Sequence, residues 1–356
     1  MRGMNRKGIL YLFLPLLMGL IACESDTGAW EAELEKAWII GRQDTVEVTA
    51  TEFYLYVPMG EEVKNERLGF SISKRASSSS VAGELSLGDT PLSITVVSEN
   101  GEVERTYRAD YMYYPTSYRF DFENWVPAHS EEGSFLVPSG GWTCGNDGID
   151  MLKAFNSTSE IPYPTMRTNH AHTGKAAVQL QTVKTPNESA PLAAGSLFLG
   201  NFNISNALKN PKHCLEMGYG YSREKGFPLR LEGWFSYQQG NGRLVDEGGL
   251  LGEDGDRCNI YAVLYTGQRL NAENIFASDR ILAIAKYTQA KDKEGYEHFS
   301  IPFRYRNLPE ELPANTMLTI MFSSSYLGQD YAGRVGAKLL IDDVSLVGGK
   351  RSDIEQ

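Results

Sequence analysis

Hydrophobic and polar residues alternate in short runs along most of the chain, the pattern of β-strands in which residues two positions apart share a face. The runs Leu92–Val97 and Val103–Tyr107 flank Asn100-Gly101, and an Asn-Gly pair between alternating runs is the strongest short-range signal of a β-hairpin. Short strands of this kind predict a small Ig-like β-sandwich over residues 44–115. Nothing in this segment gathers reactive side chains, so we predict that it serves as a spacer.

A second, longer β-rich segment covers residues 118–349. Long loops rich in Gly, Pro, Asn and Asp separate its candidate strands, and no segment carries a helical stripe over three turns; Ile281–Gln289 is the ambiguous case. Many strands without a βαβ rhythm indicate a β-sandwich, and the long loops favour a larger jelly roll. The chain is therefore predicted to be all-β. The main expected strands are Arg119–Trp125, Ala176–Gln181, Leu229–Tyr237, Ile260–Tyr265, Glu297–Phe303, Met317–Ser323 and Lys338–Leu346.

The N-terminus has the pattern of a lipoprotein signal peptide over residues 1–22. Basic residues precede the apolar stretch Ile9–Ala22, which is short for a membrane span. Leu20-Ile21-Ala22-Cys23 resembles a bacterial lipobox, which implies cleavage before Cys23 and lipidation of its thiol. The alternative is a simple secretory signal followed by an ordinary cysteine. Residues 23–43 are polar and acidic, and we expect a tether there with room for a short helix at Trp30–Trp38.

Charge and cysteine content narrow the class of partner. The net charge is −11 and no basic cluster is present, which excludes nucleic acid because binding its phosphates requires a basic surface. Beyond Cys23 the cysteines are Cys144, Cys214 and Cys258, so at most one intramolecular disulfide can form. No two of them have the spacing of metal ligands, and a zinc site is not expected.

Several stretches of the second segment follow the order of one known family. They are FENW (122–125), WTCGN (142–146), TGKAAVQLQT (173–182), AGSLFLG (194–200), GFP (226–228), LEGWFSY (231–237) and SSSYLGQDYAGRVGAKLLIDDVSL (323–346). As a set they resemble the putative carbohydrate metabolism domain of surface lipoproteins from Bacteroides and its relatives. The resemblance implies an Ig-like domain followed by a jelly roll similar to carbohydrate-binding modules, in bacteria that forage on glycans.

The same resemblance bears on location and partners. Glu24 and Asp26 follow the lipid cysteine, and acidic residues at this place often accompany lipoproteins that reach the outer face of the cell. We therefore expect an outer-membrane lipoprotein, exposed at the cell surface and held to the membrane through its lipid anchor only. The expected partners are a polysaccharide or oligosaccharide and outer-membrane proteins of glycan uptake.

By the same resemblance, two acids are candidate ligands of a structural Ca²⁺. Carbohydrate-binding jelly rolls often hold this ion with an acid from the first strand and an acid from the last, and Glu123 and Asp342 occupy those places. By parity with Leu340 and Val344, Asp342 is expected to face the core, where an unpaired acid is costly. The open alternatives are a partly exposed edge acid, an ion pair with Arg119, and a catalytic carboxylate pair.

Aromatic side chains are candidates for sugar stacking, because their flat rings match the apolar faces of pyranose rings. Trp142 on a loop and Trp234 on a strand are the predicted platforms, with Asn146, Asp147 and Arg230 as polar partners. The alternative is burial, since a strand tryptophan in a sandwich often packs in the core and a loop tryptophan can be a packed residue.

Nothing in the sequence identifies a catalytic reaction. It lacks a G-x-S-x-G elbow, an H-E-x-x-H helix and a phosphate loop. His170 and His172 would share a face of an extended segment, but no third metal ligand accompanies them and two surface histidines are expected. We therefore predict a non-catalytic glycan-binding protein. The alternatives are a glycoside hydrolase or lyase acting on the same glycans and a structural adhesion or pilus component.

Overall fold

The computed structural model describes residues 30–354 except 43–44, 64–65, 80–83, 87–90, 129–134, 156–159, 210, 247–248, 252–254, 288–291 and 293. The predicted signal peptide over residues 1–22 and the predicted lipidation site Cys23 lie outside the described residues. No described helix is long and apolar enough to cross a membrane.

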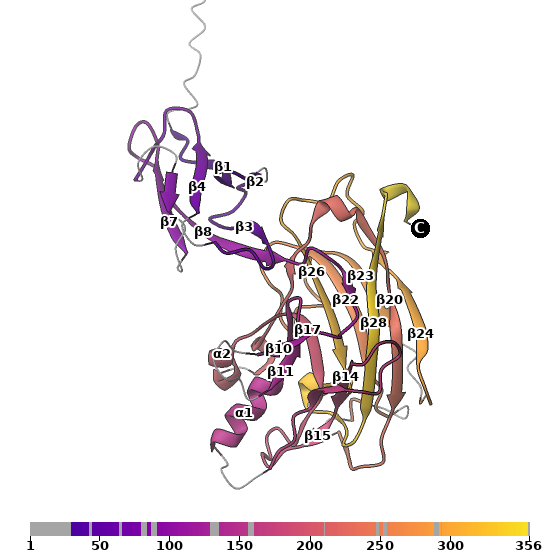
Figure 1. Ribbon diagram of the computed structural model, residues 1–356. Helices are drawn as coiled ribbons and strands as arrows, with labels where there is room; N and C mark the ends of the chain where they lie inside the picture. Colours follow the sequence, from indigo (N-terminus) through magenta and orange to yellow (C-terminus); the bar gives the residue numbers. More distant parts are fainter. Residues whose placement is uncertain are drawn as a thin grey trace, which may run out of the picture.

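The N-terminal part is a β-sandwich of two four-stranded sheets, drawn in indigo and purple in Figure 1. The sheet orders are β2-β1-β4-β6 and β3-β8-β7-β5, and residues such as Leu34, Leu55, Leu68 and Ile94 form one buried core. β7 and β8 pair antiparallel around Asn100-Gly101, so the predicted hairpin is confirmed. The strands are β1 (Leu34–Ile39), β2 (Thr45–Glu47), β3 (Glu52–Pro58), β4 (Arg67–Ile72), β5 (Ser77–Ser78), β6 (Glu84–Ser86), β7 (Leu92–Val97) and β8 (Glu104–Tyr114).

The tether predicted over residues 23–43 is wrong in its second half, as is the short helix at Trp30–Trp38. Residues 34–39 form β1, which pairs with both β2 and β4. The register of β1 against β4 shifts between Leu34 and Lys36, so the buried positions do not follow a strict alternation. That irregularity hid the strand, because a period of two is the sequence signal of a half-buried strand.

The second part is a larger β-sandwich. Its eight-stranded sheet has the path β12-β17-β26-β22-β23-β25 with β18 and β19 attached, and its six-stranded sheet has the path β13-β14-β28-β20-β24 with β9 attached. The eight-stranded sheet contains β12 (Trp142–Cys144), β17 (Ser196–Phe202), β18 (Leu215–Met217), β19 (Tyr219–Gly220), β22 (Asn259–Thr266), β23 (Ile281–Tyr287), β25 (Arg304–Tyr305) and β26 (Thr316–Ser323). The six-stranded sheet contains β9 (Arg119–Phe120), β13 (Thr165–Thr168), β14 (Ala177–Gln181), β20 (Phe227–Gln238), β24 (Glu297–Pro302) and β28 (Lys338–Gly349).

The prediction of an all-β chain built from β-sandwiches is confirmed, and the ambiguous segment is strand β23. The Ig-like and jelly-roll connectivities stay predictions. Short two-stranded sheets and turns complete this part: β10 (Trp125–Pro127) with β11 (Leu136–Pro138), β15 (Val183–Lys184) with β16 (Leu192–Ala193), β21 (Leu244–Val245) with β27 (Gly333–Arg334), and the 3-10 turns Pro211–His213, Arg223–Lys225, Gly328–Asp330 and Arg351–Asp353.

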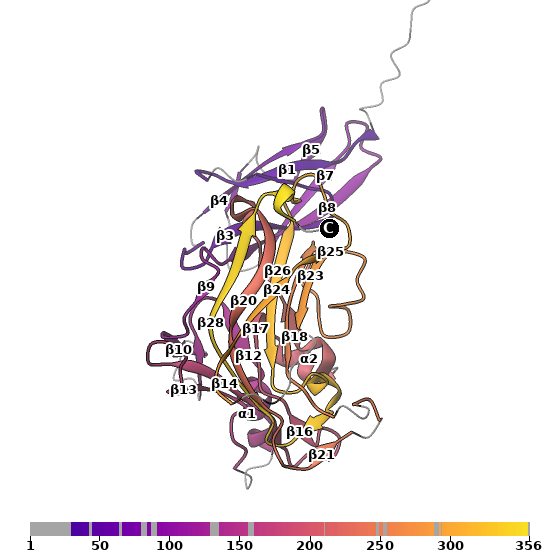
Figure 2. The ribbon, with the colours of Figure 1, turned by 90° about the vertical axis from the view of Figure 1, so that its right-hand side faces the viewer.

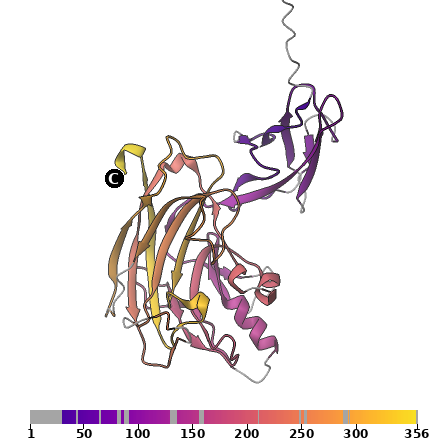
Figure 3. The same ribbon diagram turned by 180° about the vertical axis from the view of Figure 1, so that it is seen from behind.

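Two short helices were not predicted, and the predicted polar partners Asn146 and Asp147 lie on one of them. α1 (Asn146–Phe155) and α2 (Ile204–Lys209) lie beside the eight-stranded sheet, on the side away from β20 and β24 (Figure 1, Figure 3). α1 packs Ile149 and Leu152 inward with Val183, a stripe of fewer than three turns. A helix this short gives little periodic signal in a sequence.

The two sandwiches contact each other around the end of β8. Met112 of β8 belongs to the core of the second sandwich, and the Arg269 guanidinium donates to its sulfur at 3.1 Å. The Gln268 amide donates to Glu52 Oε2 at 2.6 Å, and Tyr56 packs against the same core. The first sandwich therefore has a defined junction with the second.

Candidate functional site

The six-stranded sheet is seen in Figure 2, where β28, β20 and β24 run side by side. The strand register places polar and aromatic residues in rows across its outer face. In β20, Phe235 and Leu231 are fully buried and face the core, so Trp234 and the residues in step with it face outward. Trp234 lies opposite Asp342 of β28 and His298 of β24. We call this outer surface the Trp234 face.

One end of the Trp234 face is rich in amides. Lys338 of β28 lies between Gln181 of β14 and Gln238 of β20, and Leu340 lies between Gln179 and Ser236 in the next row. A hollow of about 550 Å³ is lined in part by Gln179, Gln181, Gln238 and Lys338. Gln238 is four residues from Trp234 on the same strand, so the two side chains are about 13 Å apart along it.

Trp234 contacts two other rings, and a third ring packs behind one of them. The ring of His172 stacks on the indole with centroids 3.9 Å apart and planes 15° apart, and His298 meets the indole edge at 5.2 Å. Tyr296 in turn meets His172 at 5.6 Å. The indole is half-buried, and within the described residues its N–H makes no hydrogen bond and is not fully enclosed. Trp234 is thus oriented from one side and able to meet a ligand.

The stacking histidine sits on a loop that carboxylates fasten to the sheet. We call residues 172–176 the clamp loop. The backbone N–H groups of His172 and Thr173 donate to Asp342 Oδ2 at 2.8 and 3.3 Å. Asp343 accepts from the Thr173 hydroxyl at 2.9 Å, and its Oδ2 lies 2.8 Å from His172 Nδ1. These contacts fix the position of the His172 ring over Trp234.

Glu123 holds the other end of the clamp loop. The N–H groups of Lys175 and Ala176 both donate to Glu123 Oε1, at 2.7 and 3.0 Å. These two hydrogen bonds hold the pKa of Glu123 below its ordinary value. The two acids predicted as calcium ligands, Glu123 and Asp342, do meet at the clamp loop. Both act there as acceptors of backbone hydrogen bonds.

A β-bulge corrects the predicted orientation of Asp342. Glu232 pairs with Ser345 and Trp234 pairs with Asp342, so two residues of β28 lie opposite Gly233. The extra residue is Asp343, whose φ of 48° is in the left-handed region. The bulge reverses the parity of the strand, so Val344 faces the core while Asp342 faces outward with Trp234.

Asp342 is nevertheless fully buried, because the clamp loop covers it. Burial raises the pKa of its carboxyl above the ordinary value, while N–H donors from His172, Asp343 and Thr173 act in the opposite direction. The predicted alternative partner Arg119 is exposed and lies opposite Ser345, and the described residues show no ion pair between it and Asp342. The acid is therefore satisfied by backbone donors.

A structural calcium ion at these carboxylates stays a prediction, although their present partners are not calcium ligands. Calcium takes six to eight oxygen ligands, whereas the groups that face Glu123 and Asp342 are N–H donors. Among the described residues, no group of three or more His, Cys, Asp or Glu is arranged to hold a metal.

We expect the melting temperature of the full chain to be the same in excess CaCl₂ and in EDTA, because backbone donors already satisfy both acids. Differential scanning fluorimetry checks this. A rise in melting temperature with calcium that magnesium does not reproduce would restore calcium as a structural ion.

Gly174 allows the clamp loop to pass close to Glu123. Its φ is 67°, and a Cβ at this position would collide with the Glu123 carboxylate. Gly295 has a similar φ of 78° with nothing within 4 Å of the corresponding position. We expect Gly295→Ala to lower the free energy of unfolding by about 1 kcal/mol through backbone strain alone. Gly174→Ala should cost about 2–3 kcal/mol because it also displaces a carboxylate from its donors.

Urea denaturation of the two alanine variants measures this difference. Equal losses of stability would contradict the close contact between the clamp loop and Glu123.

The predicted role of Trp142 as an exposed platform is not compatible with its position. Only 3% of its surface is exposed, and it packs against Phe120, Phe122 and Phe322 in the core. Strand β12 begins at this residue and pairs Trp142 with Leu199, which turns the indole into the sandwich. Trp142 is therefore a packed residue, which was the alternative to a stacking platform.

The predicted polar partners do not gather around Trp234. Asn146 is fully buried, donates to the Thr165 carbonyl at 2.7 Å and accepts from the Thr165 N–H at 3.1 Å, so it holds α1 to β13. Asp147 lines a different hollow of about 450 Å³ together with Glu216. Arg230 does lie on the Trp234 face, where its Nε is 2.9 Å from Glu232 Oε1. Of the predicted set, the structure places only Arg230 on the same face as Trp234.

One family model matches most of the second sandwich, and two solved structures resemble the chain. A model of the putative carbohydrate metabolism domain matches residues 120–347. A crystal structure from Bacteroides thetaiotaomicron, described as a putative glycoside hydrolase, aligns over 92% of this chain and 98% of its own at 24% identity, with a TM-score of 0.59. One from Bacteroides vulgatus with the same description aligns over 65% of this chain and 98% of its own at 26% identity, with a TM-score of 0.53. No curated protein sequence matches.

The first of these similarities concerns the fold of nearly the whole chain, and the second covers a length comparable to the matched domain. The domain match includes the clamp loop, Trp234 and Asp342. Since it extends over more than half of the sequence, this chain belongs to the putative carbohydrate metabolism domain family.

Proposed function

We propose that this protein binds a polysaccharide or oligosaccharide along the Trp234 face and does not cleave it. The observation that supports this most is the alignment of Trp234 with a row of amides on one open sheet face. Stacking on an aromatic ring binds the apolar face of a sugar, while amides and Lys338 offer donors and acceptors to its hydroxyls. The family assignment supports a carbohydrate as the ligand.

The shape of the face suits an extended ligand. The amide hollow and Trp234 are about 13 Å apart along β20, a separation that a single sugar ring does not span. An oligosaccharide lying along the strand would contact both, which adds the binding energies of several weak contacts. We therefore expect affinity to increase with chain length up to the length of the face.

Hydrolysis beside Trp234 is disfavoured by the state of the three acids there; Asp292 and Glu294 line the amide hollow at the other end of the face. A glycosidase needs one carboxyl group as acid and a second as nucleophile or base, both able to reach the sugar. Asp342 is fully buried, Asp343 is bonded to Thr173 and His172, and Glu232 is bonded to Arg230 and Ser300. Burial raises the pKa of Glu232, but the contacts to Arg230 and Ser300 outweigh it and hold the pKa below its ordinary value. This carboxyl is therefore poorly suited to act as a general acid.

Affinity electrophoresis of the full chain in gels that contain plant or host polysaccharides tests the proposal. Retardation by at least one glycan, without release of reducing sugar, is the expected result. If a folded protein shows no retardation on a broad panel and no binding on a glycan array, the proposal fails.

We also propose that the protein acts at the cell surface, anchored through lipidated Cys23. Its lipobox sequence and the acidic residues that follow it support this. There it would hold glycans for outer-membrane uptake proteins. Labelling with a palmitate analogue should be lost in Cys23→Ala, and protease added to intact cells should degrade the wild-type protein.

A glycoside hydrolase is the second candidate, and one observation favours it. Asp147 and Glu216 line the same hollow of about 450 Å³ beside Asn201 and Asn203. The two Bacteroides structures are described as putative glycoside hydrolases. Release of reducing sugar from the glycans that bind, abolished by Asp147→Asn and by Glu216→Gln, would establish it. Glu232→Gln serves as the matched control on the other face.

A further inference from the structure

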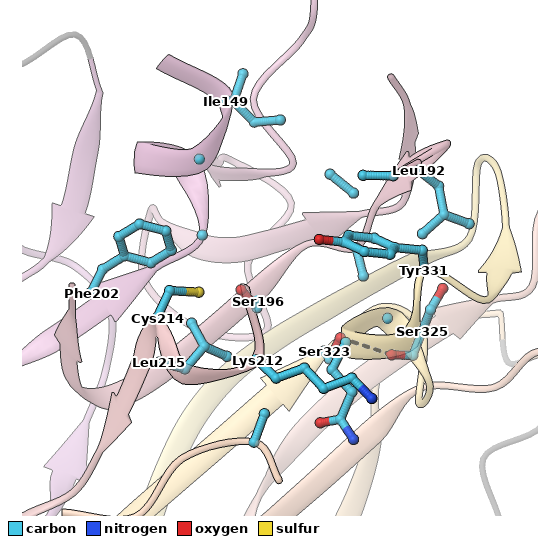
Figure 4. A pocket seen from close by; sticks show the side chains of 18 of the residues that line it. Ile149, Leu192, Ser196, Phe202, Lys212, Cys214, Leu215, Ser323, Ser325 and Tyr331 are labelled. Carbon is cyan, nitrogen blue, oxygen red and sulfur yellow. Dashed lines mark hydrogen bonds between the residues drawn. The ribbon is translucent and has the colours of Figure 1, made fainter. Parts of the chain in front are cut away.

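A cavity of about 260 Å³ lies on the outer side of the eight-stranded sheet (Figure 4). Its floor includes Ser196 of β17, Tyr261 of β22 and Met321 of β26. Its walls come from α1, β16 and the turn over residues 325–331. We call it the loop-covered cavity. It belongs to the sheet opposite the one that carries the Trp234 face, so the two sites are separate.

The cavity is lined mainly by apolar side chains. Figure 4 shows Ile149, Leu192, Phe202 and Leu215 around it. Burial of an apolar group against such a lining is favourable, by roughly 25 cal/mol for each Å² removed from water. A monosaccharide carries hydroxyls around its whole ring, and most of them would lose their hydrogen bonds here. The lining therefore favours an apolar ligand over a sugar ring.

The charges around the cavity narrow the class of ligand further. Lys212 is the one charged residue among the described residues of the lining, and its Nζ lies 2.7 Å from Asp330 Oδ1. The hydrogen bond and the charge of Asp330 raise the pKa of Lys212. Because this cation already has its counter-ion, the cavity offers no net charge to a carboxylate or phosphate. An uncharged ligand is expected.

The Ser196 hydroxyl in the floor is free to bond a ligand. Ser196 is 8% exposed, and its hydroxyl makes no hydrogen bond within the described part of the chain. Figure 4 shows this hydroxyl directed into the cavity, near the side chain of Cys214. This hydroxyl opens into the cavity and can both donate and accept a hydrogen bond there. A ligand with a single hydroxyl in reach of Ser196 would gain one hydrogen bond to it.

We propose that the loop-covered cavity binds a small uncharged aryl compound of the phenol class, with its ring among the apolar side chains and its hydroxyl on Ser196. A cavity of about 150 Å³ lined by apolar side chains is sufficient for benzene, so one of about 260 Å³ accommodates a substituted ring. Drug-sized ligands need about 300–1,000 Å³. This proposal does not rest on glycan binding, which involves the other sheet.

Isothermal titration of the full chain with 4-methylphenol and with toluene tests the proposal. Both compounds should bind, and 4-methylphenol should bind about fivefold more tightly, because one added hydrogen bond contributes about 1 kcal/mol. Ser196→Ala should keep the affinity for toluene and abolish the preference for 4-methylphenol. Ser93→Ala, an exposed serine in the first sandwich, should change neither affinity.

A second variant tests the location independently. Ala190 lines the cavity and is partly exposed, so Ala190→Phe should fill the space and abolish binding of both compounds while glycan binding is unchanged. The proposal is overturned if wild-type protein binds neither compound, or if the preference for 4-methylphenol survives in Ser196→Ala. Should Ala190→Phe fail to fold, the Ser196→Ala comparison decides alone.

Discussion

Replacing Trp234 by alanine is expected to weaken glycan binding about 30-fold or more. An aromatic residue at the centre of a binding surface typically contributes about 2 kcal/mol when truncated, which corresponds to this factor in Kd. Trp234 offers a half-buried ring, fixed by His172 at 3.9 Å, and an indole N–H without a partner among the described residues. Titration with the glycan of highest affinity from the array measures the change.

The control for this prediction is Trp30→Ala. Trp30 is 56% exposed in the first sandwich, so its removal should leave both affinity and stability nearly unchanged. His172→Ala should weaken binding by a smaller factor, because it removes the ring that orients Trp234 but leaves the indole itself. Wild-type affinity in Trp234→Ala would show that the glycan binds elsewhere.

Replacing Asp342 by alanine is expected to lower the free energy of unfolding by about 3 kcal/mol. The change leaves the N–H groups of His172, Thr173 and Asp343 without an acceptor under a covered part of the sheet. Asp342→Asn keeps one oxygen acceptor in nearly the same shape and should lose about half as much. Urea denaturation gives both values, and faster amide exchange at His172 and Thr173 would show that the loss lies in the clamp loop.

Asp279→Ala is the matched control, because Asp279 is an exposed acid of the same sandwich with no interaction among the described residues. It should change stability by less than about 0.5 kcal/mol. The account of Asp342 is contradicted if Asp342→Ala is as stable as this control. It is also contradicted if the stability lost in Asp342→Ala proves to come from calcium bound to the wild-type protein rather than from the hydrogen bonds of the clamp loop.

The alternation of residue types was sufficient to predict strands with one buried face, such as β7 and β24. It failed where the alternation is broken. Strand β1 was assigned to the tether since its register shifts between Leu34 and Lys36. α1 was missed since its inward stripe consists of little more than Ile149 and Leu152. Both failures have the same cause, which is that a periodic signal needs several undisturbed repeats.

The orientation of Asp342 shows a second limit of prediction from sequence. Parity with Leu340 and Val344 predicted that Asp342 faces the core. Leu340 itself faces outward, between Gln179 and Ser236, and the bulge at Asp343 reverses the parity between Asp342 and Val344. A residue with positive φ that is not glycine leaves little trace in a sequence. Two adjacent aspartates within an apolar strand were the available hint, because Asp tolerates this conformation better than most residues.

The grouping of His172 with Trp234 could not be predicted. The two residues are far apart in sequence, and their contact depends on carboxylates from two further segments, Glu123 and Asp342. Trp142 illustrates the opposite case. A glycine pair precedes it and indicated a loop, whereas its pairing with Leu199 turns it into the core. For aromatic residues, burial depends on the strand register, which sequence alone does not give.

The most direct test of glycan binding at the Trp234 face is a crystal structure of the full chain soaked with the oligosaccharide that binds most tightly on the array. The account predicts a sugar ring stacked on the open side of Trp234 and further sugars extending along β20 toward Gln238 and Lys338. Density in the hollow beside Asp147 and Glu216, with the Trp234 face empty, would contradict it.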